Sequence, residues 1–325
     1  MHYTLNLPYI FVIFRERKIN MPENRSDYDI QNEKIEKRMS LIKRKIVVMS
    51  GKGGVGKTTV TVNIASALAS MGLKVGILDT DVHGPNVAKM LGCEDGSVLS
   101  PDGVVMYPVE TEKGIKVMSL SFVLSDPDEA IIWRGAMKMG AIRQFLGDTE
   151  WGELDYLIID TPPGTGDEQL TVVQSIPDLT GAIIVTTPQS VAILDSRRSV
   201  TFARRTGVPI IGVIENMSGL KCPNCGTEIP VFGKGGGRNM CLDMNVPFLG
   251  AIPMELDLMK AEDSGKEWVE EGTSHPSLEA IMEIANKLEY SDACTTGREM
   301  NRLGTSSCSP EACAHCTSNC SSKKK

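Results

Sequence analysis

Apolar positions along the chain follow two alternating patterns. Short β-branched runs, the first at residues 45–50 and the second at residues 74–79, are typical of buried strands. Between these runs, apolar side chains recur at helical spacing through residues 58–70, and Gly72 stands where that helix would end. This strand–loop–helix–strand order predicts a parallel sheet.

The same alternation continues toward the C-terminus. Because the runs are continuously apolar, they predict a doubly wound α/β fold whose mostly parallel sheet is covered on both faces. Alternation and turn residues between positions 98 and 119 indicate a hairpin insertion. The further strands are predicted at residues 156–160, 182–187, 210–215 and 248–252, and the helices at residues 137–146, 191–206, 254–262 and 277–288.

Three regions of the chain differ in composition. Residues 1–44 are expected to be an N-terminal extension, with a charged, solvated leader over residues 21–44 that is able to form a helix. Residues 45–290 are expected to be the folded domain. Residues 291–325 are rich in Ser, Thr, Cys and Gly, and this composition predicts a disordered tail that is too polar to enclose a core.

The extreme N-terminus does not resemble a signal peptide. Its basic residues follow the short apolar run of residues 5–14, whereas a signal peptide carries them before that run. We hypothesise that residues 1–20 are a mis-assigned start or a disordered extension, and that Met21 begins the native protein. With no export signal, the protein is expected to be cytoplasmic.

Composition narrows the possible partners. The 325 residues carry a net charge of −7, which disfavours a nucleic-acid partner because phosphate neutralisation needs a basic face. No segment approaches the ~20 apolar residues that span a bilayer, so no membrane partner is expected. The nine cysteines, in a reducing compartment, indicate metal ligands or free thiols in preference to disulfides.

A phosphate-binding loop follows the first predicted strand. Residues 51–58 fit the pattern G-x-x-x-x-G-K-[ST], in which glycines let backbone N–H groups surround a phosphate. We therefore predict ATP and Mg²⁺ as ligands, with Lys57 reaching the β- and γ-phosphates and the Thr58 hydroxyl on Mg²⁺. The residues assigned to ATP from this segment are Gly51, Lys52, Gly53, Gly54, Val55, Gly56, Lys57, Thr58 and Thr59.

Carboxylates follow two of the predicted strands. Asp160 ends a buried strand and is predicted to hold the Mg²⁺ shell, and the glycine-rich residues 161–168 after it look like a switch that moves when the γ-phosphate leaves. Asp79 is predicted to support the metal shell. Asp81 is predicted to orient the attacking water, although an aspartate after a strand can also be a helix N-cap.

The form GKGGVGKT resembles the deviant Walker A motif of the MinD, ParA and nitrogenase-iron-protein superfamily, which has the SIMIBI-type P-loop fold. The resemblance implies an ATP-bridged homodimer in which Lys52 reaches the partner's nucleotide. A solvated surface lysine is the alternative for this residue. The superfamily pattern also makes Asn216 a candidate contact to the adenine edge. The predicted catalytic residues are Lys52, Lys57, Asp81 and Asp160.

Several further motifs resemble the Mrp family of ATP-binding iron–sulfur carriers, from about residue 45 to residue 288. This resemblance implies a homodimer that binds a [4Fe–4S] cluster transiently and passes it to recipient apoproteins. The motifs are DTDVHGPN at residues 79–86, WRG at 133–135, DTPPGTGD at 160–167, TPQ at 187–189, ENMS at 215–218 and CPNC at 222–225.

Cys222 and Cys225 are the predicted cluster ligands. Two thiolates three residues apart can bind one metal, whereas a cluster needs about four, so one pair per chain indicates a site shared across a two-fold axis. A zinc knuckle would need two further ligands, of which Cys241 supplies at most one. A redox dithiol usually lies at a helix start, which the intervening Pro-Asn fits poorly. The three glycines at 235–237 predict a flexible loop.

The tail carries a separate group of four cysteines within 13 residues. Four thiolates complete a tetrahedral or cubane site, so a second iron–sulfur site, a zinc site and unligated or redox thiols all remain open. His315 could also serve as a ligand. This tail departs from the Mrp pattern, in which the eukaryotic members carry such a cluster at the N-terminus. The cysteines are Cys308, Cys313, Cys316 and Cys320.

Three functions compete at this point. A spatial regulator like MinD or ParA would be expected to show a terminal amphipathic helix or basic patches. A reductase like the nitrogenase iron protein has single, well-separated cluster cysteines. The cluster carrier is favoured over both. Its ATPase is expected to be slow, because no arginine finger is identified beyond a guess at Arg134.

Overall fold

The computed structural model describes residues 26–81, 84–123, 135–222, 224–269 and 275–302, with backbone alone from residue 290 onward. Several predictions fall outside the described residues. They concern the start at Met21, the guess at Arg134 and the tail cysteines Cys308, Cys313, Cys316 and Cys320.

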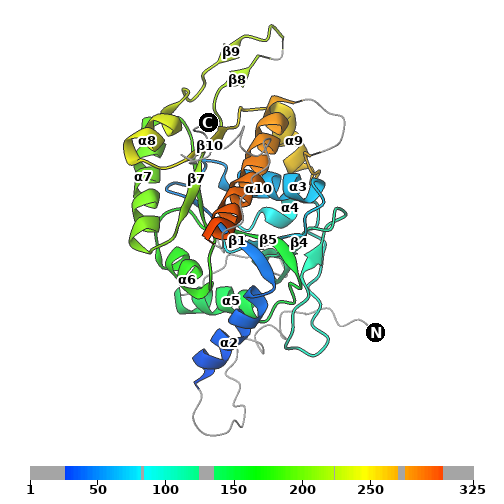
Figure 1. Cartoon of the computed structure of the whole chain (residues 1–325). Coiled ribbons are helices and arrows are strands. Elements are labelled where there is room, and N and C mark those ends of the chain that lie inside the picture. The colour runs from blue at the N-terminus through cyan, green and yellow to red at the C-terminus, as the bar shows by residue number, and fades with distance from the viewer. Residues whose placement is uncertain (1–25, 82–83, 124–134, 223, 270–274, 303–325) are drawn as a thin grey trace.

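The centre of the molecule is an eight-stranded sheet in the order β10-β7-β6-β1-β5-β2-β4-β3 (Figure 1). Every neighbouring pair is parallel except β3 with β4 at one edge. The strands are β1 Ile42–Ser50, β2 Val75–Asp79, β3 Val109–Glu110, β4 Lys116–Met118, β5 Leu154–Asp160, β6 Gly181–Thr186, β7 Ile210–Glu215 and β10 Phe248–Ala251.

Helices cover both faces of this sheet, so the predicted doubly wound α/β fold is confirmed. One face carries α3 and α10, and the other carries α2, α5, α6, α7 and α8. A short α4 and α9 lie beside α3 (Figure 1). The helices are α2 Asp27–Met39, α3 Lys57–Ser70, α4 Val87–Met90, α5 Gly135–Gly147, α6 Asp167–Ser175, α7 Ser190–Arg205, α8 Gly236–Met244, α9 Leu256–Asp263 and α10 Pro276–Arg302.

Successive side chains of β1 enter opposite core layers, as the alternation of a strand requires. Ile46 and Val48 pack in the layer of α3 and α10, whereas Val47 and Met49 pack in the layer of α2 and α5. The continuous apolar run therefore reflects a strand that is buried on both faces. The carboxyl ends of β1, β2 and β5 meet at one edge of the sheet, where the glycine-rich loop begins.

The N-terminal leader is helical, but its predicted solvation is wrong for α2. Ile35 and Met39 are 1% and 0% exposed and belong to the core. Lys34 pairs with Asp148 at 2.7 Å, and Arg38 pairs with Glu150. These contacts place α2 against α5, so the packed body begins ahead of the predicted position 45.

Three other expectations are refined. The hairpin insertion is present as β3 and β4, and β4 also extends the main sheet beside β2. The last helix continues beyond the predicted residue 288 to Arg302, into the region expected to be disordered. The glycines at 235–237 are not a flexible loop, because α8 begins at Gly236. Across the described residues, no helix has the length and apolar content needed to cross a membrane.

Candidate functional site

The glycine-rich loop joins β1 to α3 and needs its glycines for two reasons. Gly54 and Gly56 have φ values of +79° and +78°, which side chains disfavour. A Cβ on Gly51 would lie 2.2 Å from the backbone carbonyl carbon of Asp195 on α7. The loop therefore lies tightly against α7, with its backbone free to face a ligand.

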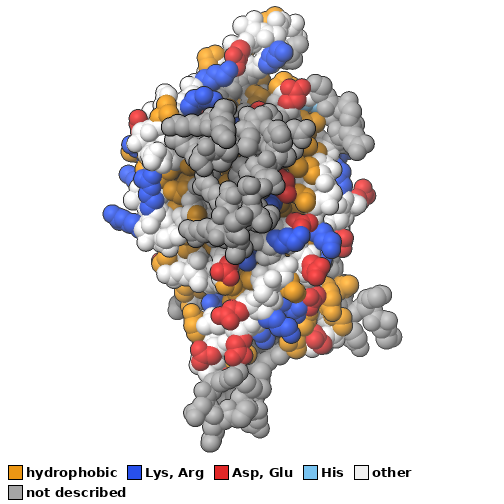
Figure 2. Space-filling model, in the orientation of Figure 1, with side chains coloured by type: hydrophobic (Ala, Val, Ile, Leu, Met, Phe, Trp, Pro, Cys, Tyr) orange, Lys and Arg blue, Asp and Glu red, His pale blue; other side chains and the backbone are white. Residues whose placement is uncertain are grey.

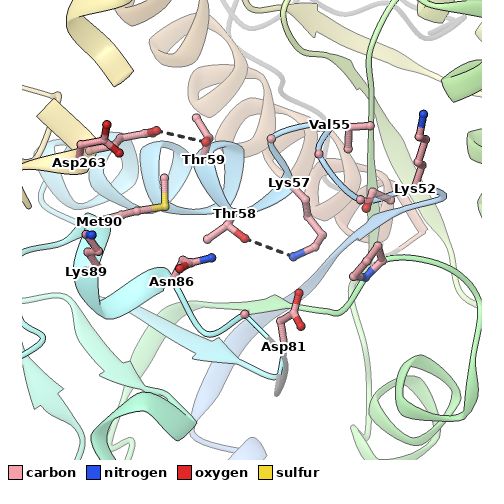
Figure 3. A pocket seen from close by; sticks show the side chains of 17 residues that line it. Lys52, Val55, Lys57, Thr58, Thr59, Asp81, Asn86, Lys89, Met90 and Asp263 are labelled. Atoms are coloured by element: carbon pink, nitrogen blue, oxygen red, sulfur yellow. Dashed lines mark hydrogen bonds between the residues drawn. The ribbon is translucent and has the colours of Figure 1, made fainter. Parts of the chain in front are cut away.

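A pocket of about 470 Å³ opens beside this loop (Figure 3). Its walls come from the loop and the start of α3, from the segment after β2, from α4 and from the end of α9. The lining residues are Ser50, Lys52, Gly53, Gly54, Val55, Gly56, Lys57, Thr58, Thr59, Asp81, Gly84, Asn86, Lys89, Met90, Pro163, Glu262 and Asp263.

Asp160 contacts the pocket-lining residues Lys57 and Thr58, which are the predicted phosphate and magnesium residues. The Lys57 Nζ lies 2.6 Å from its Oδ2, and the Thr58 hydroxyl donates to the same oxygen at 2.8 Å. Thr61 donates to Oδ1 at 2.7 Å. Asp160 is 0% exposed, so its charge is balanced by these groups and not by water.

Asp79 stands next to Asp160 because β2 and β5 pair in register at these two residues. Burial, and then the charge of Asp160, raise the pKa of Asp79 to about 8. The Asp81 backbone N–H and the Ser119 hydroxyl donate to Asp79 at 3.0 Å and 3.1 Å. Two adjacent carboxylates with a hydroxyl beside them suit a divalent cation, whose charge would relieve their repulsion.

Asp81 lies across the pocket from Lys57 and Thr58 (Figure 3). The alternative that Asp81 is a helix N-cap is wrong, because α4 begins at Val87 with Asn86 at its N-cap position. Asp81 lines the pocket, and its role toward the attacking water stays a prediction. Residues 82–83, which follow it in the predicted motif, lie outside the described residues.

Lys52 and Lys57 differ sharply in environment. Lys57 is 6% exposed, whereas Lys52 is exposed and points away from Lys57 and Thr58 (Figure 3). Lys52 has no hydrogen bond or ion pair with any residue that the structure describes. A lysine at the mouth of an anion-binding loop, with no partner in the described part of its own chain, is available to a ligand or to a second chain.

Asn216 lies beside the loop and not among the residues that line the pocket. Its side-chain amide donates to the Val55 carbonyl at 3.0 Å, and its backbone N–H donates to the Thr186 carbonyl at 2.8 Å. A Cβ on Gly56 would lie 2.2 Å from the Asn216 Nδ2. Asn216 therefore supports the loop directly, and its contact with adenine stays a prediction.

Several pocket residues were missed by the sequence patterns, namely Lys89, Met90, Glu262 and Asp263. Glu262, at the end of α9, accepts hydrogen bonds from Thr59 at 3.2 Å and from Asn63 at 2.7 Å. Burial raises the pKa of this carboxyl to about 7. Thr59 was assigned to the nucleotide from the loop motif, and Glu262 reaches it from 203 positions away in the sequence.

Cys222 and Cys225 lie at the tip of a two-stranded hairpin that projects from the body (Figure 1). Its strands are β8 Leu220–Lys221 and β9 Glu228–Ile229. The Cys222 backbone N–H donates to the Thr227 carbonyl at 2.9 Å, and the Gly226 N–H donates to the Cys222 carbonyl at 2.9 Å. These bonds close a tight turn that holds both thiols at one end of the molecule.

Cys225 is exposed and Cys222 is partly buried. The Cys225 thiol donates to the Thr227 hydroxyl at 3.3 Å. Hydrogen bonding with Thr227, and then with Cys222, lowers the pKa of Cys225 to about 7. An accessible thiol that ionises near neutral pH suits metal binding, since the thiolate is the metal ligand.

Cys241 does not join this pair. It lies in the core with Ile184, Val200 and Met240, and burial raises the pKa of its thiol to about 12. Within the described residues, no group of three or more His, Cys, Asp or Glu side chains is placed to hold a metal. The zinc knuckle with Cys241 as a third ligand is therefore wrong.

Basic side chains accompany the hairpin. Lys221 and Lys234 are exposed, and Figure 2 shows blue side chains on the projecting end of the molecule. Lys234, on the chain that leaves β9, pairs with Glu228 of β9. Lys221 and Lys234 therefore place basic side chains near the two cysteines.

Comparisons with known proteins identify the family of the chain. The profile of a ParA-type family described as the NUBPL iron-transfer P-loop NTPase matches residues 41–289. An iron–sulfur cluster carrier protein of Methanocaldococcus jannaschii is 53% identical over 249 residues, covering 76% of this chain and 85% of the relative. The human cytosolic Fe–S cluster assembly factor NUBP2 is 44% identical, covering 77% of this chain and 93% of its own length.

A solved structure gives the same result at the level of the fold. A nucleotide-binding protein from Archaeoglobus fulgidus, in complex with ADP and with cobalt detected, superposes with a TM-score of 0.65 at 41% identity. The match covers 76% of this chain and 98% of that protein. The P-loop fold that the motifs predict is therefore confirmed.

Proposed function

Because the chain belongs to the NUBPL iron-transfer P-loop NTPase family, we propose that it carries a [4Fe–4S] cluster between two copies of itself and delivers it to recipient apoproteins. Its ATPase cycle gates loading or release of this cargo. We place this activity in the cytoplasm, as the name of the human relative says of that protein.

The observation that carries the proposal is the pair of Cys222, partly buried, and Cys225, exposed, at the hairpin tip. A cubane cluster takes about four thiolate ligands, and each chain offers two at this position. With Cys241 buried in the core, the missing ligands are best supplied by the same pair of a second chain. An exposed tip also suits transfer, because a recipient's thiols can approach the cargo without crossing the protein.

The pocket residues divide the work of ATP hydrolysis. Lys57 and the loop amides hold the β- and γ-phosphates, and the Thr58 hydroxyl and Asp160 carboxylate would hold Mg²⁺ with help from Asp79. Bound Mg²⁺ supplies positive charge that neutralises the phosphates as the bond to the γ-phosphate breaks. Asp81, across from Lys57, orients the attacking water. Without an identified arginine finger, the rate is slow.

Binding of ATP requires Lys57 to change partner. In the structure its Nζ lies 2.6 Å from Asp160, with both side chains buried. When the phosphates approach, Lys57 turns to them and Asp160 is released to the metal shell. Lys52, exposed and without a partner in the described chain, is then free to contact the nucleotide of a second chain. This exchange links nucleotide binding to dimer formation.

The proposal is tested by reconstituting the protein anaerobically with iron and sulfide. A chain truncated after Tyr290 isolates the hairpin site from the tail cysteines. The truncated protein is expected to bind about four irons per dimer, and Cys222→Ser to lose them. Cys93→Ser is the matched control, since burial raises the pKa of that thiol to about 11, and it should keep its iron. Full iron retention in Cys222→Ser would overturn the proposal.

The tail cysteines are the subject of a second measurement. We propose that Cys308, Cys313, Cys316 and Cys320 hold an additional iron–sulfur site. The full chain should then bind more iron than the truncated one, and Cys313→Ala should remove that excess without affecting the hairpin site. Equal iron in the full and truncated chains would show that the tail binds none.

A further inference from the structure

A single buried carboxylate lies between the nucleotide loop and the cysteine hairpin. Glu215 ends β7 and is 1% exposed. Its Oε1 accepts from the Ser218 hydroxyl at 2.6 Å and from the Gly235 N–H at 2.8 Å, and its Oε2 accepts from the Gly237 N–H at 2.6 Å. Both oxygens are therefore engaged, and the helix dipole of α8 helps to balance the charge.

These partners belong to the two ends of the hairpin. Ser218 lies on the chain that enters β8, whereas Gly235 and Gly237 lie on the chain that leaves β9 and starts α8. Glu215 is the last residue of β7, and its hydrogen bonds thus hold both ends of the projecting hairpin at the end of that strand. The fit is close, since a Cβ on Gly237 would lie 3.1 Å from the Glu215 Oε2.

The next residue along the chain connects the same point to the nucleotide loop. Asn216 donates to the Val55 carbonyl at 3.0 Å, and its Nδ2 fills the space that a side chain on Gly56 would need. A shift of the loop when phosphate binds must therefore move Asn216 or break this bond. Either event displaces the end of β7, where Glu215 is the last residue.

Met217 completes the connection. It has a φ of +56°, in the left-handed region that non-glycine residues seldom adopt. The residues on each side are fixed, because the Asn216 N–H donates to Thr186 at 2.8 Å and the Ser218 N–H donates to Ile252 at 2.9 Å. A strained residue between two fixed ones is a position where a small displacement can change the chain direction.

We propose that Glu215 is a positioning residue that couples nucleotide occupancy of the loop to the orientation of the Cys222 and Cys225 hairpin. The inference rests on the proposed function, and it identifies how the ATPase site acts on the cargo site. Phosphate contact at the loop is transmitted through Asn216 to Glu215. Glu215 then moves both ends of the hairpin together, so the two thiols change position as one unit.

The chemistry of the link requires a carboxylate. Its two oxygens accept three hydrogen bonds in the structure. A glutamine has one acceptor oxygen and presents an NH₂ group where the second oxygen stood, so it faces an N–H donor with another donor. Glu215→Gln keeps the size of the side chain and removes one of the two hydrogen bonds to the chain that leaves the hairpin. Ser218→Ala removes one bond from the other end and leaves no unpaired donor.

The test measures the rate at which iodoacetamide modifies Cys225 in the metal-free protein, resolved by peptide mass spectrometry, with and without MgADP. MgADP is used in place of MgATP because the expected homodimer is bridged by ATP, so the readout is separate from dimer formation. Lys234→Ala is the matched control, because it breaks a pair with Glu228 inside the hairpin and leaves Glu215 untouched. Nucleotide affinity and thermal midpoint are measured for each variant.

In the native protein, MgADP is expected to change the modification rate by about fivefold or more, a typical size for coupling between sites. Glu215→Gln and Ser218→Ala should reduce the change to less than about twofold with nucleotide still bound, and Lys234→Ala should keep it. If Glu215→Gln does not fold, the result for Ser218→Ala alone tests the coupling. An undiminished change in the folded variants, or none in the native protein, overturns the coupling. Because no iron is present, such a failure is distinct from failure of the carrier proposal, which the iron content of Cys222→Ser tests.

Discussion

Replacing Lys57 by methionine should destabilise the nucleotide-free protein strongly. Lys57 and Asp160 are 2.6 Å apart, and their side chains are 6% and 1% exposed. The variant would leave the Asp160 carboxylate in the interior without its cation. Breaking a buried pair by removing one partner costs about 3–5 kcal/mol.

The structure places the expected loss toward the lower end of that range. Two hydroxyls, from Thr58 at 2.8 Å and Thr61 at 2.7 Å, continue to donate to Asp160 after the lysine is gone. We therefore expect Lys57→Met to lower the free energy of unfolding by about 3 kcal/mol at neutral pH.

Urea unfolding followed by circular dichroism, without nucleotide or Mg²⁺, measures this difference. Lys260→Met is the matched control, because the Lys260–Asp257 pair on α9 has side chains 69% and 63% exposed. Its loss should be less than about 1 kcal/mol. The reasoning is refuted if Lys57→Met unfolds at the same urea concentration as Lys260→Met.

Three more outcomes are expected. Affinity for ATP without Mg²⁺ should rise as the pH falls through about 7, because an anionic nucleotide favours the protonated form of Glu262, whose pKa burial raises to about 7; a Glu262→Gln variant with the same pH profile in calorimetry would contradict this. The rate of Cys225 alkylation should increase with pH about a midpoint near 7, and Thr227→Ala should move that midpoint toward the ordinary value of 9.0; an unmoved midpoint would exclude the Thr227 hydrogen bond as the cause. Met39→Ala, at a side chain 0% exposed, should cost about 2–5 kcal/mol in urea unfolding, and a loss below about 1 kcal/mol would mean that α2 does not pack as described.

Local sequence patterns predicted the elements whose form depends on nearby residues. The loop at residues 51–58 is specified by glycine spacing, since its backbone conformation needs positive φ at Gly54 and Gly56. The strand β1 is specified by consecutive apolar residues that enter two core layers. Asp160 could be placed near Lys57 because the carboxyl ends of neighbouring parallel strands lie at one edge of the sheet.

Contacts between distant segments escaped prediction. The leader around α2 is highly charged. The burial of Ile35 and Met39 depends on a packing partner more than 100 positions away in the sequence. The ion pair of Lys34 with Asp148, for example, joins residues 114 positions apart. Glu262 lies on an ordinary amphipathic helix, and nothing in its local sequence indicates that α9 meets α3. These positions are set by tertiary packing, which hydrophobic periodicity does not encode.

The glycines at 235–237 show a different limit. Three glycines in sequence are typical of a flexible loop, yet the structure uses their small size for close approach. A Cβ on Gly236 would lie 2.3 Å from the Pro188 carbonyl oxygen. The Glu215 carboxylate receives the N–H groups of Gly235 and Gly237. A glycine run therefore marked tight packing at a helix start and not mobility.

The central claim is that two chains share one cluster through their hairpins. Native mass spectrometry of the anaerobically reconstituted chain truncated after Tyr290 tests it most directly, because it weighs chains and cluster together. The account predicts a particle of two chains with one [4Fe–4S] unit, which Cys222→Ser abolishes. A single chain that carries a complete cluster, or a two-chain particle whose iron survives Cys222→Ser, would contradict it.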